Sequence, residues 1–317
     1  MTTVLNIRYK LLCAALVGAL ILQSCDDEEV YDVRGATQNK VYVNTQSWAP
    51  VSAPRNSTPF TVINTPIGSV INNADKVEVK FPVQCTHPAR TDVRVSFAID
   101  NALVTGDFSA IPAAVPVALN NAEVIIPAGA TSSTDSVSVS IETAHLELLA
   151  PGTYMIPVKI TSASNADVSS NLMAAFVLIN TSESNIKSLA VADDVEGTLL
   201  TKTGWSGTVS KPLASGNAAN MFTTSTTQYW RVDPGDNTFH FEVDMVSEQS
   251  NLTGIRLHTN NQNYNIVRLS VESSLDGENW TSQGQGELSL GTYQYVKFYK
   301  PVDARYFRIT VLQRRHA

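Results

Sequence analysis

The residues best suited to bind a ligand lie in one polar stretch, His258–Tyr264 (HTNNQNY). This stretch combines an imidazole, several amides and a phenol. Such side chains can donate and accept hydrogen bonds, and an aromatic ring can cover an apolar surface of a small ligand. The same composition suits an ordinary polar turn, because Asn is a good turn residue, and both interpretations stay open. The candidate ligand-binding residues are Tyr229, Arg231, His258, Asn260, Asn263, Tyr264 and Tyr293.

Sequence patterns of known catalytic sites are missing. The stretch Gly204–Gly207 (GWSG) falls short of a nucleophile elbow, because no glycine stands two residues after Ser206. The 5 histidines are scattered and form no HxxxH or HExxH pair, which argues against zinc. No two carboxylates stand out as the acid and base of a glycosidase. We therefore predict a protein that is not an enzyme, with no catalytic residues and no metal ligands.

The candidate binding residues lie in a chain dominated by strands. Apolar residues alternate with polar ones, for example over 93–99, 137–141, 154–160 and 239–245, as in antiparallel sheets with one buried face. Only 144–150 resembles a helical turn. The sequence thus predicts an all-β fold with two β-sandwich domains.

Two prolines fall inside expected strands, Pro82 and Pro157. Because proline has no N–H to donate to a neighbouring strand, we expect those strands to lie at sheet edges or to contain bulges.

Length and charge narrow the classes of function. The chain has 317 residues, of which 43% are hydrophobic and 16% charged, so it can form two buried cores. Its formal net charge is −7 with no basic stripe. Nucleic acid is therefore not an expected partner.

The N-terminus has the order of a secretory signal. Arg8 and Lys10 precede an apolar run over 11–22 that is too short to span a membrane. The following Leu22–Cys25 (LQSC) resembles a bacterial lipobox, which implies that Cys25 is acylated and becomes the first mature residue. The four acids of Asp26–Glu29 resemble the export tag of surface lipoproteins in glycan-scavenging gut bacteria; the alternative is a solvated leader extended by self-repulsion.

One cysteine remains in the mature chain. Cys13 is removed with the signal and Cys25 is lipidated, which leaves Cys85 without a partner for an internal disulfide. Cys85 continues the apolar face of Val77–Cys85, so we expect a small buried side chain rather than a nucleophile or metal ligand.

The first half of the mature chain resembles a bacterial family, the domain of unknown function 1735. The resemblance rests on 125–141 (IIPAGATSSTDSVSVSI), 154–164 (YMIPVKITSAS) and 175–180 (AFVLIN). It implies an immunoglobulin-like sandwich that follows a lipid anchor and carries no catalytic motif.

The second half resembles the discoidin, or coagulation factor type C, domain and its sugar-binding relatives, carbohydrate-binding module family 32. The motifs are 274–280 (SLDGENW) followed by 304–309 (ARYFRI). The resemblance implies a jelly-roll barrel whose loops at one end bind ligands.

Most of the residues in these motifs have expected structural roles. Asp276-Gly277 suits a tight type I′ hairpin turn, and Arg305 and Arg308 are expected to pair with nearby carboxylates. The expected packing residues are Trp205, Trp230, Trp280, Phe307 and Ile309.

Calcium is doubtful. The family carries an Asp-Gly pair that helps to hold a structural calcium, and Thr223-Thr224 stand in its place here. Since Ca²⁺ prefers carboxylate oxygens among its ligands, we predict no tightly held calcium and no other cofactor.

Together these features predict a non-catalytic glycan-binding lipoprotein at the cell surface, anchored in the outer membrane and serving a transporter complex there. The alternative is an adhesin or assembly subunit that grips a protein. The predicted parts are a signal peptide at 1–24, an acidic tether at 25–32, an immunoglobulin-like domain at 33–181, a linker at 182–197 and a discoidin-like domain at 198–317.

Overall fold

The computed structural model describes residues 38–45, 53–223, 225, 227–233, 235 and 238–315. The predicted signal peptide, Cys25 and the acidic tether lie outside the described residues. The chain from Lys40 onward forms a structural unit separate from the first 39 residues. Among the described residues, no helix has the length and apolar character needed to cross a membrane.

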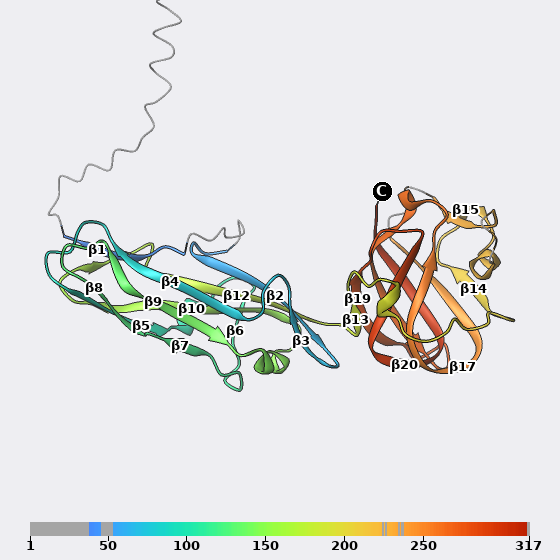
Figure 1. Cartoon of the computed structure of the whole chain (residues 1–317), viewed down its shortest axis with the longest axis horizontal. Helices are drawn as coiled ribbons and strands as arrows, with labels where there is room; N and C mark the ends of the chain where they lie inside the picture. The colour runs from blue at the N-terminus through green and yellow to red at the C-terminus, as the bar shows by residue number, and fades with distance from the viewer. Residues whose placement is uncertain are drawn as a thin grey trace, which may run out of the picture. The chain divides into compact units, whose positions relative to one another are not determined.

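The N-terminal sandwich consists of two sheets, which can be followed in Figure 1. The first sheet contains, in spatial order, β11 (Asp167–Val168), β1 (Lys40–Val43), β4 (Val77–Cys85), β9 (Ser132–Ile141) and β7 (Ala118–Asn120). The second contains β3 (Gly68–Ile71), β2 (Ser57–Thr65), β12 (Ala174–Glu183), β10 (Gly152–Ala163), β5 (Val93–Ile99) and β8 (Glu123–Ile126), with β6 (Ser109–Ala110) also paired to β10. The short helical turns are η1 (Asn101–Leu103) and η2 (Thr143–Leu148).

Side chains that alternate along the strands form the core between these sheets. Val77, Val79, Phe81, Val83 and Cys85 are all buried, as the alternation predicts. Phe81 on the first sheet meets Phe97 on the second edge to face, with ring centroids 6.0 Å apart. The buried Cys85 thiol donates a hydrogen bond to the carbonyl of His87 at 2.9 Å, which confirms its structural role.

The strands that contain proline are interior strands, and each contains a bulge. β4 pairs with β1 and β9, and its register shifts between Pro82 and Gln84. β10 pairs with β12 and β5, and the shift lies between Ile160 and Ser162. The bulge alternative therefore holds, whereas the edge alternative is wrong.

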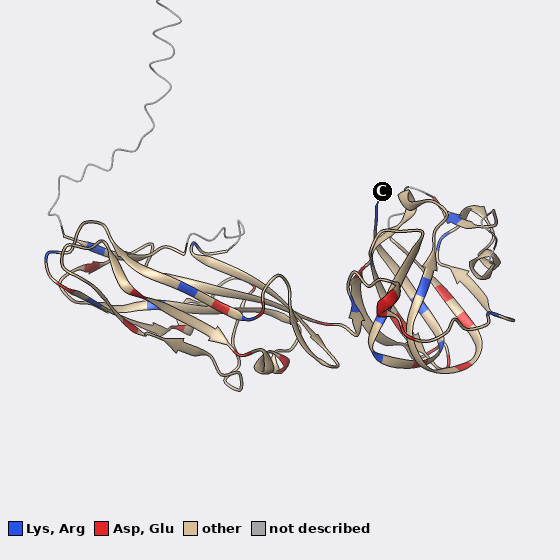
Figure 2. Ribbon diagram, in the orientation of Figure 1, with Lys and Arg blue, Asp and Glu red and all other residues tan. Residues whose placement is uncertain are grey.

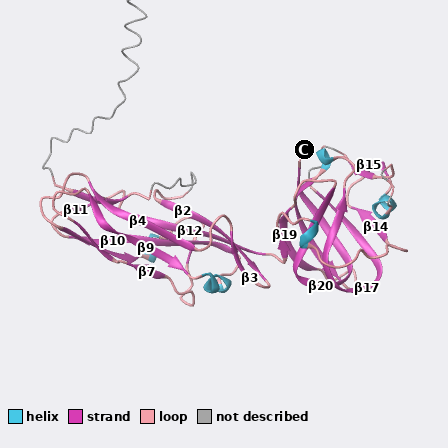
Figure 3. Cartoon of the chain, viewed as in Figure 1, coloured by secondary structure: helices cyan, strands magenta, loops and turns pink. Residues whose placement is uncertain are grey.

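The C-terminal sandwich is built on two long strands. Its main sheet runs β14 (Ser206–Val209), β17 (Phe239–His258), β20 (Tyr293–Arg314), β18 (Ile266–Ser274) and β19 (Thr281–Glu287), with β13 (Ile186–Lys187) also paired to β20. A second small sheet pairs β15 (Leu213–Gly216) with β16 (Trp230–Val232). The helical turns are η3 (Ala192–Asp194), η4 (Ala218–Phe222) and η5 (Gln262–Tyr264); Figure 3 shows how little helix accompanies the strands.

Both long strands bend to close the barrel. The first part of β17 pairs with the last part of β20, and 254–258 pair with 293–297. Phe298 and Phe307 lie on the same strand, yet their rings stack with centroids 5.9 Å apart. A straight strand would separate them by about 30 Å, at about 3.3 Å per residue. Register shifts between Asp244 and Gly254 allow the bend.

The predicted all-β class with two sandwiches is confirmed. Part of the predicted linker belongs to the second sandwich, because β13 pairs with β20 and Ile186 is buried in its core. Figure 2 shows acidic and basic residues interspersed along both sandwiches.

Candidate functional site

Two paired strand segments position the most exposed tyrosine among the candidates. His258 at the end of β17 stands opposite Tyr293 at the start of β20, and Arg256 stands opposite Tyr295. Because side chains alternate along a strand, Gln294 between the two tyrosines points inward and is 0% exposed. Tyr293 points outward and is 45% exposed.

Three side chains on this outer face, Arg256, His258 and Tyr293, form what we call the Tyr293 cluster. The rings of His258 and Tyr293 stack with centroids 4.9 Å apart and an interplanar angle of 28°. The guanidinium carbon of Arg256 lies 4.7 Å from the Tyr293 ring centroid, within the range of a cation–π contact. The cluster thus joins an exposed ring to hydrogen-bond donors, although Arg256 was not among the predicted residues.

The polar stretch after His258 forms a tight turn. The Asn261 side chain accepts a hydrogen bond from the amide of Asn263 at 2.9 Å and caps the one-turn helix η5. Asn260, Asn263 and Tyr264 are all exposed. Within the described residues, no side-chain hydrogen bond or ring contact joins these three to the Tyr293 cluster. These three residues are therefore close to the Tyr293 cluster in sequence but form no such contact with it.

Two buried amides, Asn265 and Gln294, tie this turn to the start of β20. The Asn265 side chain donates to Thr259 Oγ1 at 2.6 Å and to the Gly291 carbonyl at 2.9 Å, and accepts from the Gly291 amide at 2.8 Å. The Gln294 side chain accepts from the amide of Ile266 at 2.9 Å and donates to its carbonyl at 2.7 Å. Both residues are fully buried, so they fix the backbone on either side of Tyr293.

Sequence reasoning missed both amides. Gln294 had a usable signal, because it occupies an inward position of the stripe that continues with Val296 and Phe298. A polar residue on a buried stripe must find hydrogen bonds. Asn265 had no such signal, since it ends a run of polar turn residues.

The other predicted residues, Tyr229 and Arg231, belong to the small sheet. Tyr229 is 44% exposed, and its carbonyl accepts from the Asn220 side chain at 2.8 Å. Gly216 lies so close to it that an added Cβ would stand 1.9 Å from the Tyr229 carbonyl oxygen. Arg231 pairs in register with Ser215, and the Arg231 Nε and Ser215 Oγ atoms are buried without a hydrogen-bond partner.

The small sheet and the polar turn reach the same end of the barrel. Arg314 at the end of β20 pairs with Ile266, just after the turn, and donates to the Asp233 carbonyl at 3.4 Å, just after β16. Among the described residues, no side-chain hydrogen bond, ion pair or ring contact links Tyr229 or Arg231 to the Tyr293 cluster, so the candidates form two groups.

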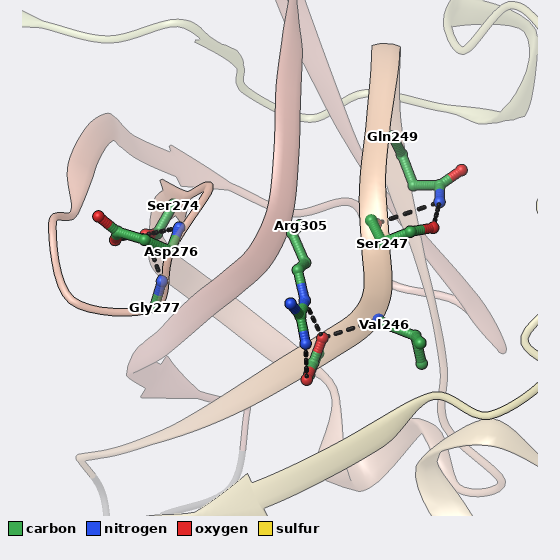
Figure 4. A network of polar contacts seen from close by, with 8 residues as sticks. Val246, Ser247, Gln249, Ser274, Asp276, Gly277 and Arg305 are labelled. Atoms are coloured by element: carbon green, nitrogen blue, oxygen red, sulfur yellow. Dashed lines mark hydrogen bonds and ion pairs between the residues drawn. The ribbon is translucent and has the colours of Figure 1, made fainter.

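The motif residues elsewhere in the barrel form ion pairs. Arg305 donates two hydrogen bonds to the carboxylate of Asp244, at 2.9 and 3.0 Å, and that carboxylate also accepts from the Val246 amide. Figure 4 shows Arg305 and Val246 on either side of this contact. These hydrogen bonds, led by that from Arg305, lower the pKa of Asp244. Arg308 pairs with Glu242 at 2.7 Å. The predicted pairing of both arginines is confirmed.

Two expectations for the loop after β18 are wrong. Asp276 does not have a positive φ, whereas Gly277 has φ 80°, so the turn is not type I′. Instead the Asp276 carboxylate accepts from Asn279 and from the Glu278 amide, which lowers its pKa. Trp280 is half-buried rather than core, because the Arg308 guanidinium stacks over its ring at 4.1 Å. Trp205, Trp230, Phe307 and Ile309 do pack against the core.

Among the described residues, no group of three or more His, Cys, Asp or Glu side chains could hold a metal. The Tyr229 carbonyl already accepts hydrogen bonds from the Asn220 side chain and from the Asn217 amide. Hard cations need several oxygens with carboxylate charge among them, and the absence of a tightly held calcium stays a prediction.

Two family models match separate parts of this chain. Residues 206–317 match the family model of the F5/8 type C domain. Residues 37–167 match a second family model, described as an N-terminal domain. A search of curated proteins found no match.

Several solved structures resemble this chain at low sequence identity. A two-domain protein of unknown function from Bacteroides fragilis is 19% identical, with a TM-score of 0.51, over 87% of this chain and 91% of its own. A family 32 carbohydrate-binding module from Clostridium perfringens, in complex with galactose, is 15% identical, with a TM-score of 0.33, over 36% of this chain and 86% of its own. A putative carbohydrate binding protein from Bacteroides ovatus is 11% identical, with a TM-score of 0.34, over 86% of this chain and 63% of its own.

Proposed function

We propose that this chain, which carries an F5/8 type C (discoidin) domain over residues 206–317, is a non-catalytic glycan-binding protein of the cell surface. The observation that supports the proposal best is the Tyr293 cluster. It exposes an aromatic ring beside a guanidinium and an imidazole, next to a turn rich in exposed amides.

The cluster suits a sugar for physical reasons. The C–H face of a pyranose ring is apolar and packs on an aromatic ring, while its hydroxyl groups need donors and acceptors around the rim. Asn265 and Gln294 hold the backbone beside Tyr293 in place before any ligand arrives. Ordering the site on binding therefore costs little.

Binding at such an open surface is expected to be weak for one site. Many copies in one membrane raise the effective affinity for a long glycan, because the second contact is intramolecular. This fits a protein that captures polysaccharide and passes it to a neighbouring transporter complex in the outer membrane. The N-terminal sandwich would act as a spacer.

The anchor is proposed from the sequence. The apolar run over 11–22, the lipobox around Cys25 and the four acids after it support acylation and surface display in the outer membrane. Metabolic labelling with radioactive palmitate tests this step: the wild-type chain should be labelled and Cys25→Ser should not. Protease added to intact cells should then cleave the wild-type chain.

Glycan binding is tested with the chain from residue 30 to its end, which includes the whole unit from Lys40 onward. On a glycan array and in affinity gels, the wild-type protein should be retained by at least one polysaccharide, and Tyr293→Ala should lose that retention. Leu275→Ala removes a similarly exposed apolar side chain outside both candidate groups and serves as the control. A folded protein that no glycan retains would count against the proposal and favour the protein-binding alternative.

A further inference from the structure

We infer that the Tyr293 cluster selects glycans that carry a carboxylate, that is, uronic acid residues. This inference rests on the proposed glycan binding and names the class of sugar. The evidence for it is the charged residues on the outer face of β17 and β20. The sequence alone did not show that these residues are neighbours.

The guanidinium of Arg256 forms no ion pair with a carboxylate in the part of the chain that the structure describes. Among the described residues, its contact is the cation–π stack on Tyr293. The neighbouring arginines differ, since Arg305 is paired with Asp244 and Arg308 with Glu242. An exposed guanidinium that is held over a ring keeps its N–H groups available for a planar carboxylate, which it binds with two parallel hydrogen bonds.

The surrounding face is positive and aromatic. The outward positions of the paired segments 254–258 and 293–297 are Gly254, Arg256, His258, Tyr293, Tyr295 and Lys297. They include two permanent cations and no carboxylate, but the carboxylate of Asp194 in η3, which pairs with Lys187, also interacts electrostatically with Lys297. The chain as a whole has a net charge of −7, so this face departs from the average surface. An acidic ligand meets complementary charge here, which favours its binding over that of a neutral one.

The short distances favour a carboxylate bonded directly to the sugar ring. The Arg256 guanidinium carbon lies 4.7 Å from the centre of the Tyr293 ring, and the His258 ring lies 4.9 Å from it. In a uronic acid the carboxylate is attached to a ring carbon. One residue can therefore pack its C–H surface against the solvent-exposed part of the cluster and reach Arg256 at the same time. A sulfate ester holds its charge further from the ring.

The test compares acidic polysaccharides with their neutral counterparts. Polygalacturonate, alginate and hyaluronan are each measured by affinity gel electrophoresis and calorimetry, beside carboxyl-reduced samples of the same polymers. A sulfated galactan serves as the comparison anion. The protein is the chain from residue 30 onward, as wild type and as Arg256→Gln, Arg256→Lys and Arg268→Gln. Arg268 is an exposed arginine on β18, so its substitution makes the same change in net charge away from the cluster.

At least one uronate polymer should bind about 10- to 100-fold more tightly than its carboxyl-reduced form, since a hydrogen-bonded charge pair replaces a neutral contact. Arg256→Gln should remove that difference, Arg256→Lys should keep only part of it, and Arg268→Gln should leave it unchanged.

The inference is overturned if acidic and reduced polymers bind equally, if the sulfated galactan alone is retained, or if Arg256→Gln and Arg268→Gln behave alike. If the protein retains neutral glycans through Tyr293 and shows no preference for acidic ones, this inference is wrong and the proposed function still holds. Failure of every glycan to bind would instead remove the proposed function itself.

Discussion

Replacing Asn265 with alanine is expected to lower the free energy of unfolding of the C-terminal sandwich by about 3 kcal/mol. Its side chain makes three hydrogen bonds, two to Gly291 and one to Thr259. Each contributes about 1 kcal/mol net, and more where the abandoned partner stays buried. Because Asn265 is 0% exposed, water cannot replace these bonds without entering the barrel end.

The assay must separate the two sandwiches, since a two-domain chain does not unfold in a single two-state transition. Trp205 and Trp230 pack against the C-terminal core, so tryptophan fluorescence reports chiefly on that sandwich. The buried Cys85 thiol reports on the N-terminal sandwich through its labelling rate. In Asn265→Ala, the fluorescence midpoint should fall by about 10 °C, while thiol labelling should stay as in the wild type.

The matched control is Asn263→Ala, which removes the same side chain from an exposed position in the same turn. Its effect should stay within about 0.5 kcal/mol. Hydrogen exchange adds a local readout, because the Gly291 amide donates to Asn265 and should lose protection only in Asn265→Ala. If the two variants were equally stable, the hydrogen bonds of Asn265 would not be holding the turn against β20. The argument that the site is ordered before a ligand binds would then be wrong.

Two further predictions concern the same barrel. Val246 is 52% exposed and has φ 72°, a conformation that strains a β-branched residue. Val246→Asn should therefore raise the free energy of unfolding, measured by urea titration, by about 1 kcal/mol. An unchanged urea midpoint would show that Val246 is not strained. The carboxylates of Asp244 and Asp276 have lowered pKa values, through hydrogen bonds from Arg305 and Asn279 respectively. Their stabilisation is present above the unfolded pKa of about 4 and is lost as the pH falls through their lower folded values. Thermal unfolding between neutral and strongly acidic pH should show this loss, with a shallower decline in Asp276→Asn than in the wild type; identical slopes would contradict the assignment.

Several features could be predicted from local sequence because they depend on local chemistry. Alternation along Val77–Cys85 required a buried face, and that face is buried. The arginines of the closing strand needed nearby carboxylates and found them in Asp244 and Glu242. The prolines required irregular strands, and both strands contain bulges. The type I′ prediction failed because Asp276 uses its side chain to hold the turn, as Asp often does.

The candidate site could be predicted only in part. Tyr293 and the polar turn were visible as aromatic and amide residues in expected loops, although whether they bind a ligand stays a prediction. Arg256 could not be predicted as part of the site, because it lies within a strand and far from Tyr293 in the sequence. Only the pairing of 254–258 with 293–297 brings these residues together.

The sequence by itself determined an all-β chain with two apolar cores, since alternation of side chains along a strand follows from backbone geometry alone. Tertiary structure decided which outward residues became neighbours. That choice depends on strand register, and register here is set by the bulges of β17 and by the buried amides of Asn265 and Gln294. A shift of one residue would turn Tyr293 inward and Gln294 outward. The cluster of ring and cations therefore belongs to the fold and not to any short motif.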